Sequence, residues 1–284
     1  MADAGEAAAG RGGGRDAAGE DGSGVGPGVM EMEEPAERLI SFWSQVDPAD
    51  GVQVHRDDRS IFDTLTASIR DHMPSTPKDW MLGARAGKIE LGLVPAPYCG
   101  DIRNAKVFIC MLNPGLADVD FYAEQKQDYR ARLARQLRQE GLERDEFPFL
   151  HLDPTYCWTG GYRWWISKLD GIIKYFAEKR NMDYFQSSRW LSTKVASLEL
   201  FPYHSKNFRS HRLLKTLPSV KIMLEFAQTL AARGDCLIVS RQVGSWGLSG
   251  RGVLTYDAKH ARGASLSPIS KGGKKVIEVL SASQ

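Results

Sequence analysis

Four short apolar runs, separated by longer segments with helical periodicity, constrain the fold of this chain more than any other feature. The runs occupy residues 106–112, 194–201, 235–240 and 252–257. They are apolar on both faces, which is typical of strands buried in a parallel sheet. Helical segments are expected at 33–46, 59–73, 119–141, 161–179, 219–234 and 272–283. This alternation predicts an α/β domain of three layers, α/β/α, with a central, largely parallel sheet of four strands.

The start of the chain differs from the rest in composition. Of the first 30 residues, 17 are Ala or Gly and none is aromatic. Such a segment cannot bury enough apolar surface to offset the entropy lost on ordering. We therefore predict a disordered tail over 1–32 and a single domain over 33–284, in which N-terminal helices (33–92) precede a core (93–284). No stretch has the length of a membrane span, and we expect a monomeric, cytoplasmic protein.

Charge and cysteine usage narrow the class of function. Residues 1–34 carry two Arg against eight acidic residues, so the rest of the chain has a net charge of +8. This excess is compatible with a polyanionic partner, although a solvated basic surface is the alternative. The four Cys are far apart and form no C-x-x-C pair, which indicates a reducing compartment without a disulfide framework or a zinc site. No phosphate-binding Gly-rich motif follows a strand, so we expect no metal and no cofactor.

Polar, aromatic and small residues follow the predicted strands. Ligands of parallel sheets bind at the carboxyl ends of the strands. Asn113-Pro114-Gly115 follows the first strand, His204 follows the second, and residues 260–268 follow the fourth. The sequence therefore predicts a binding site at this rim. The alternative for Asn113 is a plain turn cap.

These motifs resemble those of the uracil-DNA glycosylase superfamily. Asn-Pro-Gly after an apolar strand, with Phe121 and Tyr122 close behind, is similar to the family's first motif and to its single-strand-selective branch. LELFPYHS, CLIVSRQVGSWG and SLSPIS follow in the family's order, so the resemblance covers roughly 95–284. It implies a uracil-DNA glycosylase-like fold and a DNA glycosylase that flips a base, hydrolyses its N-glycosidic bond and leaves an abasic site.

Two departures from the family pattern bear on the substrate. The place of the family's uracil-reading Asn reads Leu200-Phe201-Pro202, and the last motif lacks His-Pro-Ser. We therefore expect a modified or damaged pyrimidine as substrate, in DNA repair or in defence against phage with modified DNA. A non-catalytic DNA-binding module of the same fold is the alternative. An unrelated small-molecule hydrolase is disfavoured because no G-x-S-x-G motif is present.

The resemblance assigns roles to individual residues. Asn113 is expected to hold the attacking water through its side-chain carbonyl. Arg262 is the preferred donor to the leaving base, with His204 and His260 as alternatives and His204 also a reader of the base edge. The remaining substrate-binding candidates are Pro114, Gly115, Phe121, Tyr122 and Tyr203.

DNA contacts are expected in the loop after the fourth strand and at the start of the last helix. Hydroxyls and Lys cluster there, which suits phosphate binding. Leu266 is the preferred wedge for the gap left by a flipped nucleotide, with Ile269 as second choice and packing under the loop as the alternative. The Arg residues of 130–138 are expected on a solvated helix face, and Trp158, Trp164 and Trp165 in the core. The phosphate candidates are Ser265, Ser267, Lys271 and Lys274.

Overall fold

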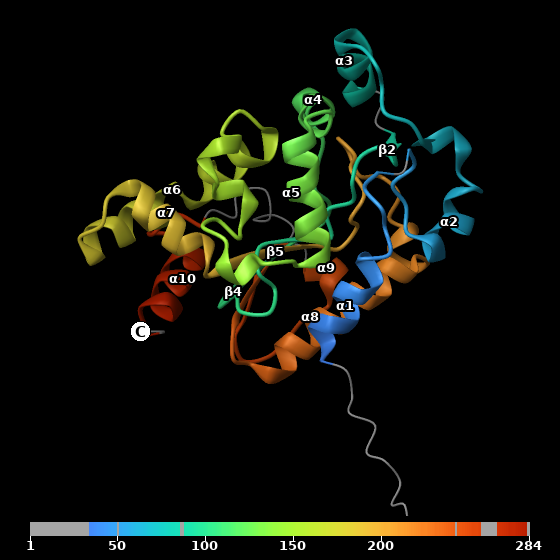
Figure 1. The fold of residues 1–284 in the computed structure, drawn as a ribbon. Helices are drawn as coiled ribbons and strands as arrows, with labels where there is room; N and C mark the ends of the chain where they lie inside the picture. Colours follow the sequence, from blue (N-terminus) through green and yellow to red (C-terminus); the bar gives the residue numbers. More distant parts are fainter. Residues whose placement is uncertain (1–33, 50, 86–87, 242, 257–265, 283–284) are drawn as a thin grey trace, which may run out of the picture. The chain divides into compact units, whose positions relative to one another are not determined.

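The main sheet of the computed structural model is centred on β4 (Val107–Met111), which pairs in parallel with β5 on one side and β6 on the other (Figure 1). Among the residues described, the strand order is β3-β5-β4-β6-β7, and only the edge strand β3 is antiparallel to its neighbour. The other strands of this sheet are β3 (Tyr98–Cys99), β5 (Val195–Glu199), β6 (Leu237–Ser240) and β7 (Val253–Thr255). The predicted α/β class with a largely parallel sheet is confirmed. The predicted count of four strands is wrong, because β3 has only two residues and forms no apolar run of its own.

The structure describes residues 34–49, 51–85, 88–241, 243–256 and 266–282, all of which belong to one compact unit. The predicted tail (1–32) and three predicted site residues, His260, Arg262 and Ser265, lie outside the described residues. Within the described ranges, no helix is both long enough and apolar enough to cross a bilayer.

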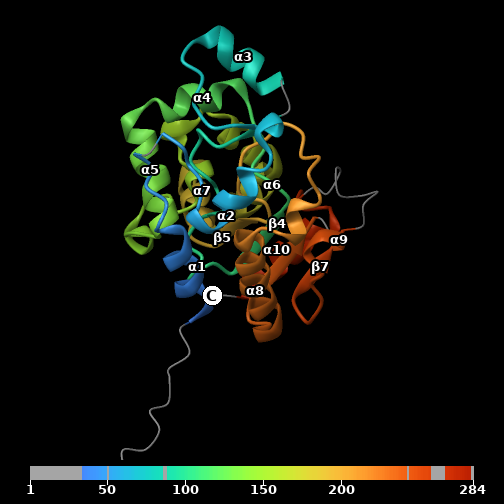
Figure 2. The ribbon, with the colours of Figure 1, turned by 90° about the vertical axis from the view of Figure 1, so that its right-hand side faces the viewer.

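Helices cover both faces of the sheet. Phe108 and Cys110 of β4 belong to the apolar cluster that contains α1 and α8, whereas Val107 and Ile109 pack with α6, α7 and α10. This alternation follows from the two-residue period of a strand. Figures 1 and 2, which are related by a quarter turn, both show α1 beside α8. The helices are α1 (Pro35–Trp43), α2 (Arg56–Phe62), α3 (Pro77–Arg85), α4 (Asp118–Glu124), α5 (Gln127–Arg138), α6 (Gly160–Arg180), α7 (Tyr184–Ser192), α8 (Pro218–Arg233), α9 (Val243–Trp246) and α10 (Lys271–Ala282), with short 3₁₀ turns at Thr66–Ser68, Leu142–Arg144, Leu150–Leu152, Pro154–Tyr156 and Leu213–Lys215.

The helix predicted over 59–73 is wrong beyond Phe62. The chain instead forms β1 (Ile69–Arg70), which pairs in parallel with β2 (Ile89–Glu90). The amide of Leu91 donates to the carbonyl of Arg70 at 2.7 Å. These pairings with a distant segment override the helical spacing of the local apolar residues, which sequence periodicity alone could not reveal.

The helix predicted over 119–141 is broken into α4 and α5 at Lys126, whose backbone is extended. Two Arg of α5 hold neighbouring loops: the guanidinium of Arg132 pairs with Asp145 and donates to the carbonyl of Phe147 at 2.5 Å, while Arg130 donates to the carbonyl of Pro48 at 2.5 Å. Arg132 is only 6% exposed. The expectation of a solvated Arg face is therefore wrong for Arg132, which supports the fold.

The helix predicted over 219–234 is present as α8. Gly234 follows it with a left-handed φ of 66°, a conformation that favours glycine. Pro218 begins the helix, so Ser219 lies inside its first turn, where the Ser219 amide donates to Asp58 at 3.1 Å.

The segment before α10 is anchored by Leu266. Its side chain is 2% exposed and packs in the cluster of α6 and α10. Ile269, three residues later, is 86% exposed. The prediction that Leu266 acts as a wedge does not fit this placement, because a wedge must reach the base stack from the surface. Ile269, the second choice, has the required exposure.

We expect Leu266→Ala to lower the free energy of unfolding by about 2–5 kcal/mol, the range for removing a buried Leu side chain. Ile269→Ala serves as control and should change it by less than about 0.5 kcal/mol, because the side chain is in water. Urea unfolding of the two variants measures both values. A Leu266→Ala variant as stable as the parent would contradict this placement.

Candidate functional site

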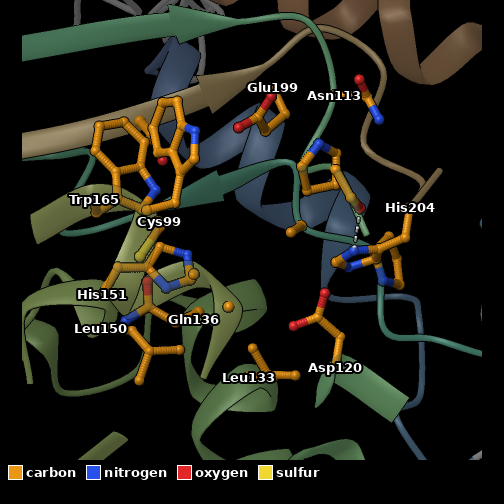
Figure 3. Close-up of a pocket in the computed structure, with 18 of the residues that line it drawn as sticks. Cys99, Asn113, Asp120, Leu133, Gln136, Leu150, His151, Trp165, Glu199 and His204 are labelled. Atoms are coloured by element: carbon orange, nitrogen blue, oxygen red, sulfur yellow. Dashed lines mark hydrogen bonds between the residues drawn. The ribbon is translucent and has the colours of Figure 1, made fainter. Parts of the chain in front are cut away.

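A cavity of about 400 Å³ lies where the carboxyl ends of β4 and β5 meet (Figure 3). Met111 and Glu199, the last residues of these strands, are register partners, so the two chains leave the sheet at the same level. Polar, aromatic and apolar side chains line it together. The lining comes from the turn after β4 (Asn113, Pro114, Gly115), from α4 (Asp120, Glu124), from α5 (Gln136), from the start of α6 (Gly161, Trp164, Trp165) and from His151, Glu199 and His204.

The turn after β4 has a backbone that only glycine adopts without strain. Gly115 has a φ of 72°, in the left-handed region. A Cβ built on it would meet nothing within 4 Å, so the requirement is one of conformation and not of space. Pro114 beside it fixes the preceding φ. The turn is therefore rigid and leaves open room above its backbone.

Asn113 is held in one orientation by the loop after β5. Its amide nitrogen donates to the carbonyl of Ser205 at 2.9 Å and lies 3.2 Å from the Ser205 hydroxyl. Ser205 itself is 1% exposed. Both amide hydrogens have acceptors, so the side-chain oxygen Oδ1 is the atom that can accept a hydrogen bond from a bound water.

His204 spans two backbone carbonyls. Its Nδ1 lies 3.1 Å from the carbonyl of Gly115 and its Nε2 lies 3.1 Å from that of Val94. Burial lowers the pKa of His204, while the carboxylate of Asp120 opposes this shift. A neutral imidazole has one N–H and donates to one of the two carbonyls at a time. The ring thus fastens the turn at Gly115 while lining the cavity, and its predicted contact with the base edge stays a prediction.

Two carboxyl groups of α4 face the cavity one helical turn apart. Asp120 accepts from the amide of Ala117 at 2.6 Å, and Glu124 accepts from that of Val94 at 2.9 Å. Burial raises the pKa of Asp120, and it raises the pKa of Glu124 to about 8. Glu124 is therefore mostly protonated at neutral pH, and its buried position carries little charge.

Glu199 brings a third carboxyl group to the cavity from the end of β5. It is 7% exposed, and its Oε2 has no hydrogen-bond partner among the described residues. Burial raises the pKa of Glu199 well above its usual range, and the charge of Arg241 acts in the opposite direction. A buried neutral carboxyl offers one donor and one acceptor side by side. Such an unsatisfied group is costly and points to a ligand that pairs with it.

Aromatic rings form the wall opposite the turn. Trp164 and Trp165 are in edge contact at 4.8 Å, and Trp165 lies parallel to the ring of His151 at 6.4 Å. Trp165 is buried, as predicted, but Trp164 is 37% exposed and has the guanidinium of Arg241 5.4 Å from its ring centre. The prediction of a core position is therefore wrong for Trp164, whose ring faces the cavity.

His151 reaches the cavity because Gly161 has no side chain. A Cβ at Gly161 would lie 2.5 Å from two atoms of the imidazole ring. Burial lowers the pKa of His151 to about 4, so the ring is neutral at pH 7. Neither His151 nor Glu199 was singled out from the sequence. A charged residue inside an apolar strand was the available signal for Glu199.

Three predicted substrate contacts lie away from the cavity lining. Phe121 is fully buried and packs with Leu93, and Tyr203 is fully buried with its hydroxyl donating to Asp58 at 2.6 Å. Tyr122 packs between Trp80 and Trp158 at ring distances of 5.9 and 5.7 Å. Phe121 and Tyr203 do not fit the predicted binding roles, because both rings are covered by the protein itself. Tyr122 is 39% exposed but does not line the cavity, and its role stays a prediction.

The predicted phosphate-binding residues that the structure describes lie in the turn before α10 and in the first turn of that helix. The carbonyl of Ser267 accepts from both the amide and the hydroxyl of Ser270, at 2.9 and 2.7 Å. Lys271 and Lys274 are exposed in the first turn of α10. The two Lys are available to a partner, and their role stays a prediction.

The part of the chain that the structure describes contains no group of three or more His, Cys, Asp or Glu able to hold a metal ion. No protein-family model matches the chain, and comparison with curated proteins and with solved structures gave no match either.

We expect Glu124→Gln to raise the melting temperature at pH about 8 and to change it little at pH about 4. The folded pKa is raised from 4.5 to about 8, so between these values the folded state holds a proton that the unfolded state loses. The free energy of unfolding of the parent therefore falls as pH rises through this window, whereas Gln keeps the acceptor for Val94 and does not titrate.

Melting curves at the two pH values measure this difference. Glu143→Gln is the matched control, because that carboxyl is exposed and its replacement should act equally at both pH values. Equal shifts for Glu124→Gln at both pH values would contradict a raised pKa.

Proposed function

We propose that this chain is a DNA glycosylase that hydrolyses the N-glycosidic bond of a flipped, modified or damaged pyrimidine and leaves an abasic site. The observation that carries the proposal is Asn113, set in a rigid turn at a cavity and held through its amide nitrogen by Ser205. An amide oxygen fixed in this way can hold a water for attack without acting as a strong base. We also propose that the layers of the fold are arranged as in the uracil-DNA glycosylase superfamily, whose first motif the turn Asn113-Pro114-Gly115 resembles.

The proposed reaction needs little more than positioning. The bond between C1′ and the base nitrogen breaks, and its electron pair leaves with the base. The oxygen of the water held by Asn113 bonds to C1′ and loses a proton, while the departing base gains one. Trp164 offers a partly exposed ring on which a flipped base can stack. Hydrogen-bond donors near the base stabilise the charge that develops on it.

Glu199 is the best-placed reader of the base among the described residues. The neutral carboxyl can donate through its O–H and accept through its carbonyl oxygen, which matches the paired donor and acceptor on a pyrimidine edge. His151, neutral and close to Trp165, can supply a further contact. Arg262 remains a proposed donor to the leaving base.

We expect Asn113→Ala to lower the rate of base release by about 10²-fold or more, the scale for loss of a positioning or electrostatic group. The assay incubates DNAs that carry different modified pyrimidines and detects abasic sites by alkaline cleavage. Gln228→Ala, which removes an exposed amide side chain of α8 that does not line the cavity, is the control and should keep the parent rate.

Near-normal release by a folded Asn113→Ala variant would contradict the assignment. Binding of these DNAs by the parent without any abasic site would favour the alternative of a non-catalytic DNA-binding module.

We expect Glu199→Gln to retain most of the activity and Glu199→Ala to lose about 10²-fold, because Gln keeps a donor and an acceptor. The pH profile provides a second readout. Since the pKa of Glu199 is raised, the parent rate should fall as rising pH ionises this carboxyl, because a carboxylate would repel the charge forming on the base. The Gln variant should lack this alkaline fall. Equal losses in the two variants would show that Glu199 does not read the base.

A further inference from the structure

The loop that follows β5 carries an uninterrupted excess of positive charge. From Leu200 to Leu224 the chain contains no Asp or Glu. Within this stretch the cations recur at every third position of residues 206–215, here called the cationic loop. They are Lys206, Arg209, Arg212 and Lys215. Figure 2 shows this part of the chain in light orange.

These four side chains have no acidic partner in the part of the chain that the structure describes. All four are exposed, and none forms an ion pair with a described residue. Other Arg of the chain behave differently: Arg70 pairs with Glu90, and Arg103 pairs with Glu37. Four exposed cations without acidic partners on one short loop repel one another, and this cost is offset when an anionic partner binds.

The cationic loop is nevertheless anchored to the fold. Phe208 packs on Phe201 with ring centres 4.6 Å apart, and Leu213 is 4% exposed. Just before the loop, the amide of Glu90 donates to the carbonyl of His204 at 2.9 Å. The apolar side chains therefore fix the path of the backbone while the cations project into water.

The loop begins at the mouth of the cavity. Ser205, the residue before Lys206, holds the amide of Asn113, and His204 lines the cavity. We propose that the cationic loop binds the backbone phosphates of the DNA strand whose base enters the cavity. This inference rests on the proposed function for the identity of the polyanion. Lys and Arg at such a place position a strand without reading its sequence.

Equilibrium binding of the full chain to a labelled duplex of ordinary bases, followed by anisotropy over a series of salt concentrations, tests this proposal. The double variant Lys206→Ala/Lys215→Ala is compared with the double variant Lys106→Ala/Lys179→Ala. The control removes the same charge from two exposed Lys, one immediately before β4 and one near the C-terminus of α6. Each phosphate contact contributes about 0.9 to the slope of log K against log salt concentration. We therefore expect the slope to fall by about two in the loop variant and to stay unchanged in the control.

Melting temperatures confirm that both variants are folded. An unchanged slope in the loop variant, or an equal fall in both variants, would overturn the proposal. Loss of binding to polyglutamate without a change in the DNA slope would also overturn it, because the loop would then serve an acidic protein. This test measures binding to a duplex of ordinary bases and requires no base release. Its result is therefore independent of the activity measured for the parent and for Asn113→Ala.

Discussion

The register between β4 and β5 is the constraint on which the rest of the site depends. Because Met111 lies opposite Glu199, the turn after β4 and the loop after β5 leave the sheet side by side. Asn113 can then be bound by Ser205, and His204 can reach the carbonyl of Gly115. A slip of one residue would turn Glu199 to the other face of the sheet and separate these groups.

The interior of the cavity and the loop outside it differ in charge. Three carboxyl groups, from Asp120, Glu124 and Glu199, face the cavity with raised pKa values, so the interior favours neutral hydrogen-bonding groups over ions. The cationic loop outside remains charged because it is in water. A flipped base is neutral and its backbone is anionic, and the two regions match these two parts of one ligand.

The sequence predicted those parts of the fold that depend on local pattern. The strand at 106–112 and the helix at 161–179 were found because their apolar spacing is decided by burial against a sheet. The helix expected at 59–73 failed because Arg70 pairs with a strand about 20 residues away, a contact that no local period encodes.

The site was predicted less completely than the fold. Asn113 and Gly115 were identified because their turn follows a buried strand directly. Glu199 was passed over although its charge in an apolar strand was visible, and Trp164 was placed in the core because aromatic residues usually are. Leu266 was expected at the surface, and only three-dimensional packing distinguishes it from Ile269.

Gly161 restricts how the size of this cavity can change by mutation. The imidazole of His151 occupies the space that any side chain there would need. A single methyl group at Gly161 would push the ring inward and narrow the cavity, or would force α6 away from the 3₁₀ turn Leu150–Leu152, which carries His151, and widen the cavity. The width of the cavity is thus set by the lack of a side chain at position 161. A substitution there could change the size of ligand that the cavity admits without replacing a residue that contacts the ligand.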